Sequence, residues 1–263
     1  MAIGELVFGS KEINRNVSFR FILPEDIFAR DGENPNYKRP TKTLYLLHGK
    51  GNYNDEWLAG SMIRDFAYIY NLAIFMPSGE DSFYLNQRQA KRNYADYVGR
   101  ELVDYTRNVF GLSCKREDTF VGGISMGGFG ALHTGLAFPD TFGKIMALSS
   151  ALIIHDIAEK KEDFEDGIGD YWYYRSVFGD LDTLLTSENN PEQLIRNLKE
   201  EKRTMPEIYM ACGTEDFLLE KNREFAKFLK ENEVPSEYHE GPGDHNFRFW
   251  NPFLEKAIQW MVK

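Results

Sequence analysis

Short apolar runs alternate with longer segments of helical periodicity along most of the 263-residue chain. Continuous apolar runs are typical of strands buried on both faces, and strands that alternate with helices pair in parallel. The pattern therefore predicts an α/β fold with a mostly parallel central sheet and helices on both faces. The predicted strands are 44–47, 72–76, 119–121, 145–148, 208–211 and 237–239, with an early antiparallel strand at 15–23; the predicted helices are 55–70, 94–110, 126–138, 220–232 and 252–262.

One long segment, residues 152–205, breaks this alternation because it contains no pattern of a buried strand. It is acidic and aromatic, and a helix is expected at 191–203 within it. Ligand sites in open α/β sheets lie outside the carboxyl ends of the strands. We therefore predict a single domain, residues 1–263, in which 152–205 forms a cap or lid over those ends. The alternative is an extra helical pair packed on the side of the domain. Residues 29–42, rich in Pro, Gly, Asn and charge, are expected to form an exposed loop.

Composition limits the partners of the chain. A hydrophobic content of 42% and a charged content of 27% suit a globular domain, and the net charge is −10. A surface of this charge repels nucleic acid and anionic membranes, so neither is an expected partner. No stretch reaches the ~18 apolar residues that a membrane helix needs, and no leader pattern opens the chain, so a cytoplasmic location is expected. The cysteines Cys114 and Cys212 form no C-x-x-C pair, which argues against structural zinc.

The most specific motif is G-x-S-x-G in TFVGGISMGGFGA, with its serine at Ser125. A β-prone run enters the motif and a helix-compatible stretch leaves it, which is the strand–turn–helix context of a nucleophile elbow. The flanking glycines remove side chains that would clash in so tight a turn. The motif predicts that Ser125 is a catalytic nucleophile, with a glycine-rich turn that merely packs a helix on the sheet as the alternative.

A serine nucleophile at neutral pH needs a general base, for which histidine is the usual choice. His245 lies in the loop GPGDHNF, between the last predicted strand and the last helix, and so at the same sheet edge as Ser125. The acid of a triad would follow another strand, and the turn after 208–211 offers Glu215 and Asp216. We choose Asp216 because the shorter side chain is better fixed for orienting an imidazole. The alternative role for Asp216 is to cap the helix that begins near Leu218.

An acyl-transfer site also needs two backbone N–H groups that stabilise an oxyanion. One is expected from Met126, the residue after the nucleophile. The other is expected from Lys50, because LLHGKGN reads as an apolar strand, a sharp glycine turn and an exposed amide. An ordinary glycine-rich turn is the alternative, and it would leave the Lys50 amide unaligned with Ser125.

The ordered set TLYLLHGKGNYNDEW, MPSGEDSFY, VGGISMGGFGA, CGTEDFL and GDHNFRFW resembles the esterase D group of the α/β-hydrolases. This group includes tributyrin esterases, S-formylglutathione hydrolases, and bacterial acetyl and feruloyl esterases, and the tributyrin esterases look nearest. The resemblance implies an α/β-hydrolase fold, a triad of Ser125, Asp216 and His245, and oxyanion donors at Lys50 and Met126. It implies no metal and no organic cofactor. Substrate-binding candidates are Asn52, Trp57, Tyr84 and Trp172.

The favoured function is a serine carboxylesterase for short acyl, acetyl or feruloyl-type esters, acting through an acyl-enzyme. The alternatives are a thioesterase like S-formylglutathione hydrolase and a non-catalytic carbohydrate-binding relative. A peptidase on the same fold is a further alternative. The expected partner is a small-molecule or carbohydrate-linked ester. The oligomeric state is left open, a homo-oligomer included.

Overall fold

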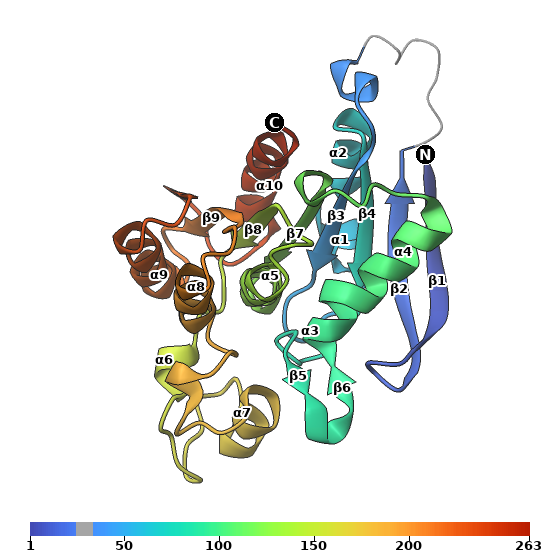
Figure 1. Ribbon diagram of the computed structural model, residues 1–263. Helices are drawn as coiled ribbons and strands as arrows, with labels where there is room; N and C mark the ends of the chain where they lie inside the picture. The colour runs from blue at the N-terminus through green and yellow to red at the C-terminus, as the bar shows by residue number, and fades with distance from the viewer. Residues whose placement is uncertain (25–33) are drawn as a thin grey trace.

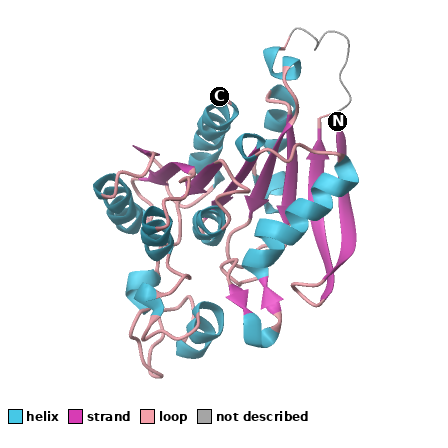
Figure 2. Cartoon of the chain, viewed as in Figure 1, coloured by secondary structure: helices cyan, strands magenta, loops and turns pink. Residues whose placement is uncertain are grey.

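The central feature of the computed structural model, which describes residues 1–24 and 34–263, is a twisted eight-stranded sheet (Figures 1 and 2). Its strand order is β1 (Ala2–Ser10), β2 (Arg15–Leu23), β4 (Leu72–Pro77), β3 (Lys42–Leu47), β7 (Thr119–Ile124), β8 (Lys144–Leu148), β9 (Glu207–Gly213) and β10 (Ser236–Gly241). β1, β2 and β4 pair antiparallel, and all pairs from β4 to β10 are parallel. The carboxyl ends of β3, β7, β8, β9 and β10 therefore meet at one edge.

Helices cover both faces of this sheet, as the alternating pattern predicts. They are α1 (Glu56–Gly60), α2 (Ile63–Ile69), α3 (Tyr94–Asp96), α4 (Leu102–Phe110), α5 (Met126–Ala137), α6 (Ile154–Ile157), α7 (Tyr171–Phe178), α8 (Pro191–Glu200), α9 (Leu219–Glu231) and α10 (Phe247–Val262). Successive strand residues point to opposite faces, so Leu44 and Leu46 pack under α1, α2 and α10, whereas Tyr45 and Leu47 pack under α4, α5 and α8. Two hydrophobic cores result, one on each face.

The predicted α/β class and the parallel strands are confirmed, and several details differ. The predicted helix 55–70 is two helices, because Ser61 turns the chain after Gly60 and its hydroxyl donates to the Trp57 carbonyl (2.5 Å). The edge strand β1, which pairs with β2, was not predicted. The last helix begins at Phe247, five residues before the predicted start at Pro252. Part of the predicted loop 29–42 lies outside the described residues, and its remainder includes the 3₁₀ turn Pro35–Lys38.

Residues 152–205 separate into two parts. α6 and α7 lie beyond the carboxyl edge of the sheet, at the bottom of Figure 1, whereas α8 packs against α5 on one face. The Tyr173 hydroxyl donates to the Asp81 carbonyl (2.9 Å), which ties α7 to the loop that follows β4. The segment thus combines a helix at the edge, as a cap requires, with a helix packed on the side of the domain.

The buried His133 of α5 gives the fold a testable dependence on pH. Burial lowers the pKa of His133 to about 4, against a hydrogen bond to the Glu188 carbonyl that raises it. In the unfolded chain the pKa is about 6.5, so between these pH values the unfolded chain binds more protons and the free energy of unfolding rises with pH, by up to about 3 kcal/mol. This contribution is complete above pH ~6.5 and is lost as the pH falls towards ~4.

We expect His133→Gln to lose less stability than the wild type between pH 7.5 and 4.5, measured by urea unfolding. The half-buried His239→Gln is the matched control and should keep the wild-type dependence. An unaltered pH dependence in His133→Gln would contradict the assignment of a neutral, buried imidazole.

Candidate active site

Ser125 occupies the sharp turn between β7 and α5. Its backbone angles are φ 54° and ψ −120°, outside the region that a non-glycine residue prefers. The motif glycines are needed for close backbone approach: a Cβ at Gly123 would overlap the Gly127 carbonyl, and one at Gly127 would overlap the Leu47 carbonyl. Ser125 N–H donates to the Leu148 carbonyl (3.0 Å), and its own carbonyl accepts from Phe129 and Ala151. The strained conformation is therefore held by β8, by the loop that follows it and by the first turn of α5.

His245 and Asp216, separated by 29 residues in sequence, meet at the same edge. His245 Nδ1 lies 2.9 Å from Asp216 Oδ2. Because an ionised carboxylate only accepts, Nδ1 carries the proton and Nε2 is left as a base. The His245 ring contacts Phe217 and Trp250 at centroid distances of 4.8 and 5.0 Å, which fixes its plane. This is the arrangement in which a carboxylate selects the tautomer and orientation of a general base.

Asp216 also caps the following helical turn, so the two roles considered from the sequence coexist. Its Oδ1 accepts from the Leu218 N–H (2.9 Å), while Oδ2 serves His245. Burial raises the pKa of Asp216, but hydrogen bonds from His245, from Leu218 and from the Ser149 hydroxyl outweigh it and hold the pKa below its ordinary value. Asp216 is therefore ionised at neutral pH. The rejected candidate Glu215 instead accepts from the Gly243 N–H and holds the loop that carries His245.

The loop after β3 lies beside Ser125. A Cβ added to Gly49 would stand 3.6 Å from Cβ of Ser125, so the backbone of this loop approaches the serine closely. The Lys50 N–H makes no backbone hydrogen bond within the described residues, and Met126, as the first residue of α5, has no intrahelical acceptor for its N–H. Both amides predicted as oxyanion donors are thus unengaged. The Lys50 side chain turns away and pairs with Asp81 (3.8 Å).

Glu56, which the sequence analysis did not identify, clamps this loop. Its Oε2 accepts from the Gly49 N–H (2.6 Å) and its Oε1 accepts from Asn52 Nδ2 (2.7 Å). Burial raises the pKa of Glu56, opposed by the hydrogen bond from Gly49 and by the nearby His245. The sequence signal that could have identified Glu56 is its position in the first helical turn after a glycine-rich loop. Ser149, which accepts from Trp250 Nε1 (2.9 Å), was also missed, although it directly follows β8 at the carboxyl edge.

Replacing Glu56 with alanine is expected to lower kcat for an acetyl ester by up to about a hundredfold. The loop after β3 would lose its clamp, and a displacement of about 1 Å in a group that positions the reacting atoms can lower the rate by this factor. The fold should survive, since Glu56 is only half-buried. Steady-state kinetics with p-nitrophenyl acetate is the measurement, and Glu231→Ala on the exposed face of α9 is the control. An unchanged kcat would show that the loop keeps its conformation without the carboxylate.

The four predicted substrate-binding residues fall in different environments. Asn52 is exposed, and its side chain is engaged by Glu56. Trp57 is 1% exposed and donates through Nε1 to the Leu47 carbonyl (3.0 Å), while Tyr84 is fully buried with its hydroxyl on the His48 backbone. Both aromatic side chains therefore support the loop from beneath. Trp172 is 55% exposed on α7.

His48 supports the backbone of the loop after β3. Its Nε2 accepts from the Gly79 N–H (2.8 Å), and its Nδ1 donates to the Gly49 carbonyl (2.7 Å). Burial lowers its pKa, which keeps the ring neutral. Within the described part of the chain, no group of three or more His, Cys, Asp or Glu side chains is placed to hold a metal ion. Among those same residues, no helix combines the length and apolar character that crossing a membrane requires.

The sheet order, the serine elbow and the acid–histidine pair define an α/β-hydrolase. The family model described as "Putative esterase" matches residues 10–261, and the chain belongs to this esterase family. It is 45% identical, over all of its length and 99% of the relative's, to an acetyl esterase of Caldicellulosiruptor saccharolyticus. The chain is thus an esterase that acts on carboxylic ester bonds, as the resemblance to the esterase D group implied.

Solved structures agree with this family. The fluorophosphonate-binding serine hydrolase FphF of Staphylococcus aureus is 31% identical, with a TM-score of 0.85 over 100% of this chain and 98% of that one. S-formylglutathione hydrolase FrmB of the same organism is 30% identical, with a TM-score of 0.83 over 100% and 99% of the two chains. A ferulic acid esterase at 20% identity, with a TM-score of 0.74, shares the fold.

Proposed function

We propose that the chain is a serine acetyl esterase in which Ser125 is the nucleophile, His245 the general base and Asp216 the residue that orients it. The observation that carries the proposal is the 2.9 Å hydrogen bond from His245 Nδ1 to Asp216, at the sheet edge where Ser125 occupies a strained elbow. The 45% identity to an acetyl esterase supports acetyl as the acyl group.

The reaction proceeds through two acyl transfers. Ser125 Oγ attacks the ester carbonyl while His245 Nε2 takes its proton, and the same proton then passes to the leaving alcohol as the C–O bond breaks. The N–H groups of Lys50 and Met126 stabilise the oxyanion, and each such donor contributes about 3 kcal/mol of transition-state stabilisation. Water, deprotonated by His245, then attacks the acetyl-enzyme, releasing acetate and restoring Ser125.

A fluorophosphonate probe tests the nucleophile directly, since it bonds covalently to an activated serine hydroxyl. We expect one adduct per chain, located by tandem mass spectrometry on the peptide that contains Ser125, and loss of p-nitrophenyl acetate turnover in the same proportion. Labelling of Ser125 should disappear in His245→Ala, which keeps the hydroxyl but lacks the base. An adduct on any other serine would refute the assignment.

Thioester hydrolysis is the second candidate, favoured by the 30% identity to S-formylglutathione hydrolase over the full chain. A panel of acetyl to octanoyl p-nitrophenyl esters, methyl ferulate, acetylated xylan and S-formylglutathione separates the two. We expect the highest kcat/KM on acetyl esters. A larger kcat/KM on S-formylglutathione would favour the thioesterase.

A further inference from the structure

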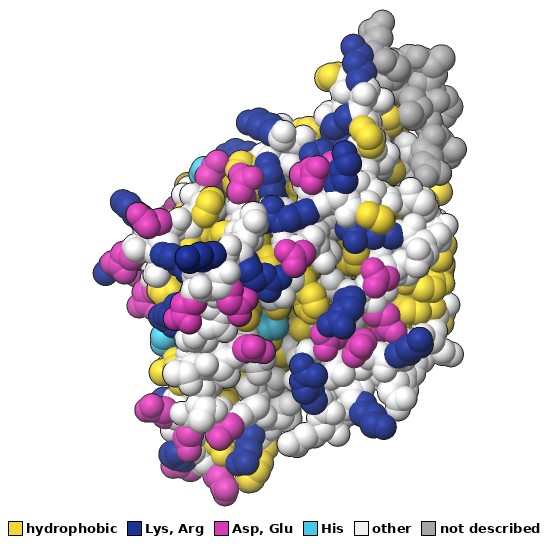
Figure 3. Space-filling view, viewed as in Figure 1, with side chains coloured by type: hydrophobic (Ala, Val, Ile, Leu, Met, Phe, Trp, Pro, Cys, Tyr) yellow, Lys and Arg dark blue, Asp and Glu magenta, His cyan; other side chains and the backbone are white. Residues whose placement is uncertain are grey.

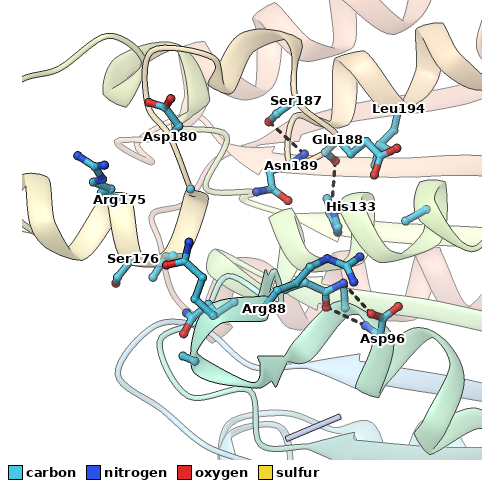
Figure 4. A pocket seen from close by; sticks show the side chains of 18 of the residues that line it. Arg88, Asp96, His133, Arg175, Ser176, Asp180, Ser187, Glu188, Asn189 and Leu194 are labelled. Carbon is cyan, nitrogen blue, oxygen red and sulfur yellow. Dashed lines mark hydrogen bonds between the residues drawn. The ribbon is translucent and has the colours of Figure 1, made fainter.

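A cavity of about 960 Å³ lies beside α5, and none of Ser125, Asp216 and His245 lines it. Figure 4 shows its three sides: α7 on one, the hairpin of β5 (Asn86–Gln87) and β6 (Arg92–Asn93) on another, and the loop before α8 on the third. His133 of α5 is part of its lining. The volume is near the upper end of the ~300–1,000 Å³ that ligand pockets occupy. It is large enough for more than one sugar ring.

One face of α7 supplies an aromatic platform and polar groups. Trp172, Arg175 and Ser176 stand at positions i, i+3 and i+4, which share one side of a helix, and all three line the cavity. Trp172 is 55% exposed, an unusual state for an indole on a globular protein. An exposed indole offers an apolar face and one N–H donor, which suits a ligand that is apolar on its ring face and polar at its rim.

The charged groups of the cavity balance. Within the described residues the guanidinium groups of Arg88 and Arg175 form no ion pair, and of the three carboxylates in the lining only Asp96 is paired, with Arg100. Two cations without an ion pair therefore face two carboxylates without one, those of Asp180 and Glu188. Arg175 Nη1 donates to the Tyr171 hydroxyl (2.9 Å), and Asp180 Oδ1 accepts from the Asp182 N–H (3.1 Å). The face of the molecule in Figure 3 likewise intersperses basic and acidic side chains. This balance favours a neutral ligand over a phosphate or a nucleotide.

One ring nitrogen of the buried histidine in the lining, Nδ1 of His133, lacks a hydrogen-bond partner among the described residues. His133 is 5% exposed, and its Nε2 lies 3.1 Å from the Glu188 carbonyl, which can only accept, so Nε2 carries the proton. Its Nδ1 is therefore an acceptor, and it has no partner among the described residues. Buried polar groups are almost always hydrogen-bonded, so an unpartnered Nδ1 behind the cavity wall is uncommon.

We propose that this cavity binds a neutral oligosaccharide, with a sugar ring stacked on Trp172 and hydroxyl groups bonded to the Arg88, Arg175 and Asp180 side chains. Planar side chains with paired donors or acceptors suit the vicinal hydroxyls of a pyranose. The identity of the ligand rests on the proposed acetyl esterase function: it is the sugar chain that bears the acetyl ester. His133 lies eight residues along α5 from Ser125, which is about 12 Å along the helix axis. An oligosaccharide can reach from the cavity to Ser125 over this distance, whereas a single sugar cannot.

The test titrates unsubstituted xylohexaose into the wild type and into Ser125→Ala, with calorimetry and tryptophan fluorescence as readouts. Trp57 and Trp250 are buried, and Trp260 packs against Tyr209 and does not line the cavity, so Trp172 is placed to report binding. We expect saturable binding in both proteins and at least about tenfold weaker binding in Trp172→Ala and Arg175→Ala, as truncating a tryptophan or arginine anchor commonly produces. Trp172→Tyr should retain part of the affinity. The exposed Arg64→Ala on α2 is the matched control and should bind normally.

Absence of saturable binding, or equal affinity in Trp172→Ala and Arg175→Ala, would overturn the proposal. Inorganic phosphate that competes with xylohexaose would also overturn it, by making the cavity an anion site. Circular dichroism and thermal unfolding check each variant, and Arg175→Ala decides the matter if Trp172→Ala fails to fold. Xylohexaose binding is measured in a protein that lacks the catalytic serine, so absence of binding rejects the cavity proposal alone. Absence of acetyl ester turnover in the wild type rejects the acetyl esterase proposal.

Discussion

Replacing Ser125 with alanine is expected to lower kcat/KM for p-nitrophenyl acetate by about 10⁵-fold or more, which is the scale seen when a serine nucleophile is removed. Only the hydroxyl group is lost. Alanine at this position, with φ 54°, has the same backbone strain as the serine. The free energy of unfolding should therefore change little. Initial rates at saturating and subsaturating ester measure the effect.

The control for this variant is Ser236→Ala, which removes a hydroxyl from the start of β10. It should keep wild-type turnover and thermal unfolding. Retained turnover in Ser125→Ala, after correction for background hydrolysis, would reject the acyl-enzyme mechanism as a whole.

Asp216→Asn is expected to reduce kcat by about 10⁴-fold with little change in KM, because the amide stabilises the wrong imidazole tautomer. In the wild type the carboxylate accepts from Nδ1, whereas an amide nitrogen facing Nδ1 would donate and turn the His245 proton towards Ser125. Asparagine still accepts the Leu218 N–H, so the helical turn keeps its cap. The kinetic loss should thus appear without a matching loss of stability.

The control is Asp140→Asn, an exposed carboxylate that pairs with Arg203. Normal turnover in Asp216→Asn, together with a stability loss of about 1 kcal/mol in Asp216→Ala, which truncates the cap, would assign Asp216 to capping alone.

Much of the fold could be predicted from local patterns. The apolar runs in β3, β4, β7 and β8 are short, continuous and separated by helical periods, so they specify a parallel sheet without reference to any partner. The strand β1 alternates between exposed and half-buried residues along its length, and so lacks the continuous apolar run that marks the others. The break at Ser61 was missed because its cause, a hydroxyl bonded to a carbonyl one turn back, leaves the helical period of apolar residues intact.

Two substrate-binding predictions show why side-chain roles need the tertiary structure. Trp57 and Tyr84 lie near the motifs of the resemblance, and aromatics there could have lined a pocket. The structure instead buries both beneath the loop at His48 and Gly49, where their polar atoms bond to backbone. Burial depends on which elements pack above a residue, and no local pattern encodes that.

The sequence by itself determined the α/β class and the glycine-flanked turn at Ser125, and it predicted the order serine, acid, histidine, because glycine requirements and strand ends are local properties. Only the tertiary structure decided that one carboxylate of Asp216 serves both the Leu218 cap and His245, and that Glu56 clamps Gly49. It alone brought α7 and the β5–β6 hairpin together around the cavity that Trp172 lines. These arrangements join residues that are distant in the chain, and their geometry arises from the packing of whole helices on the sheet.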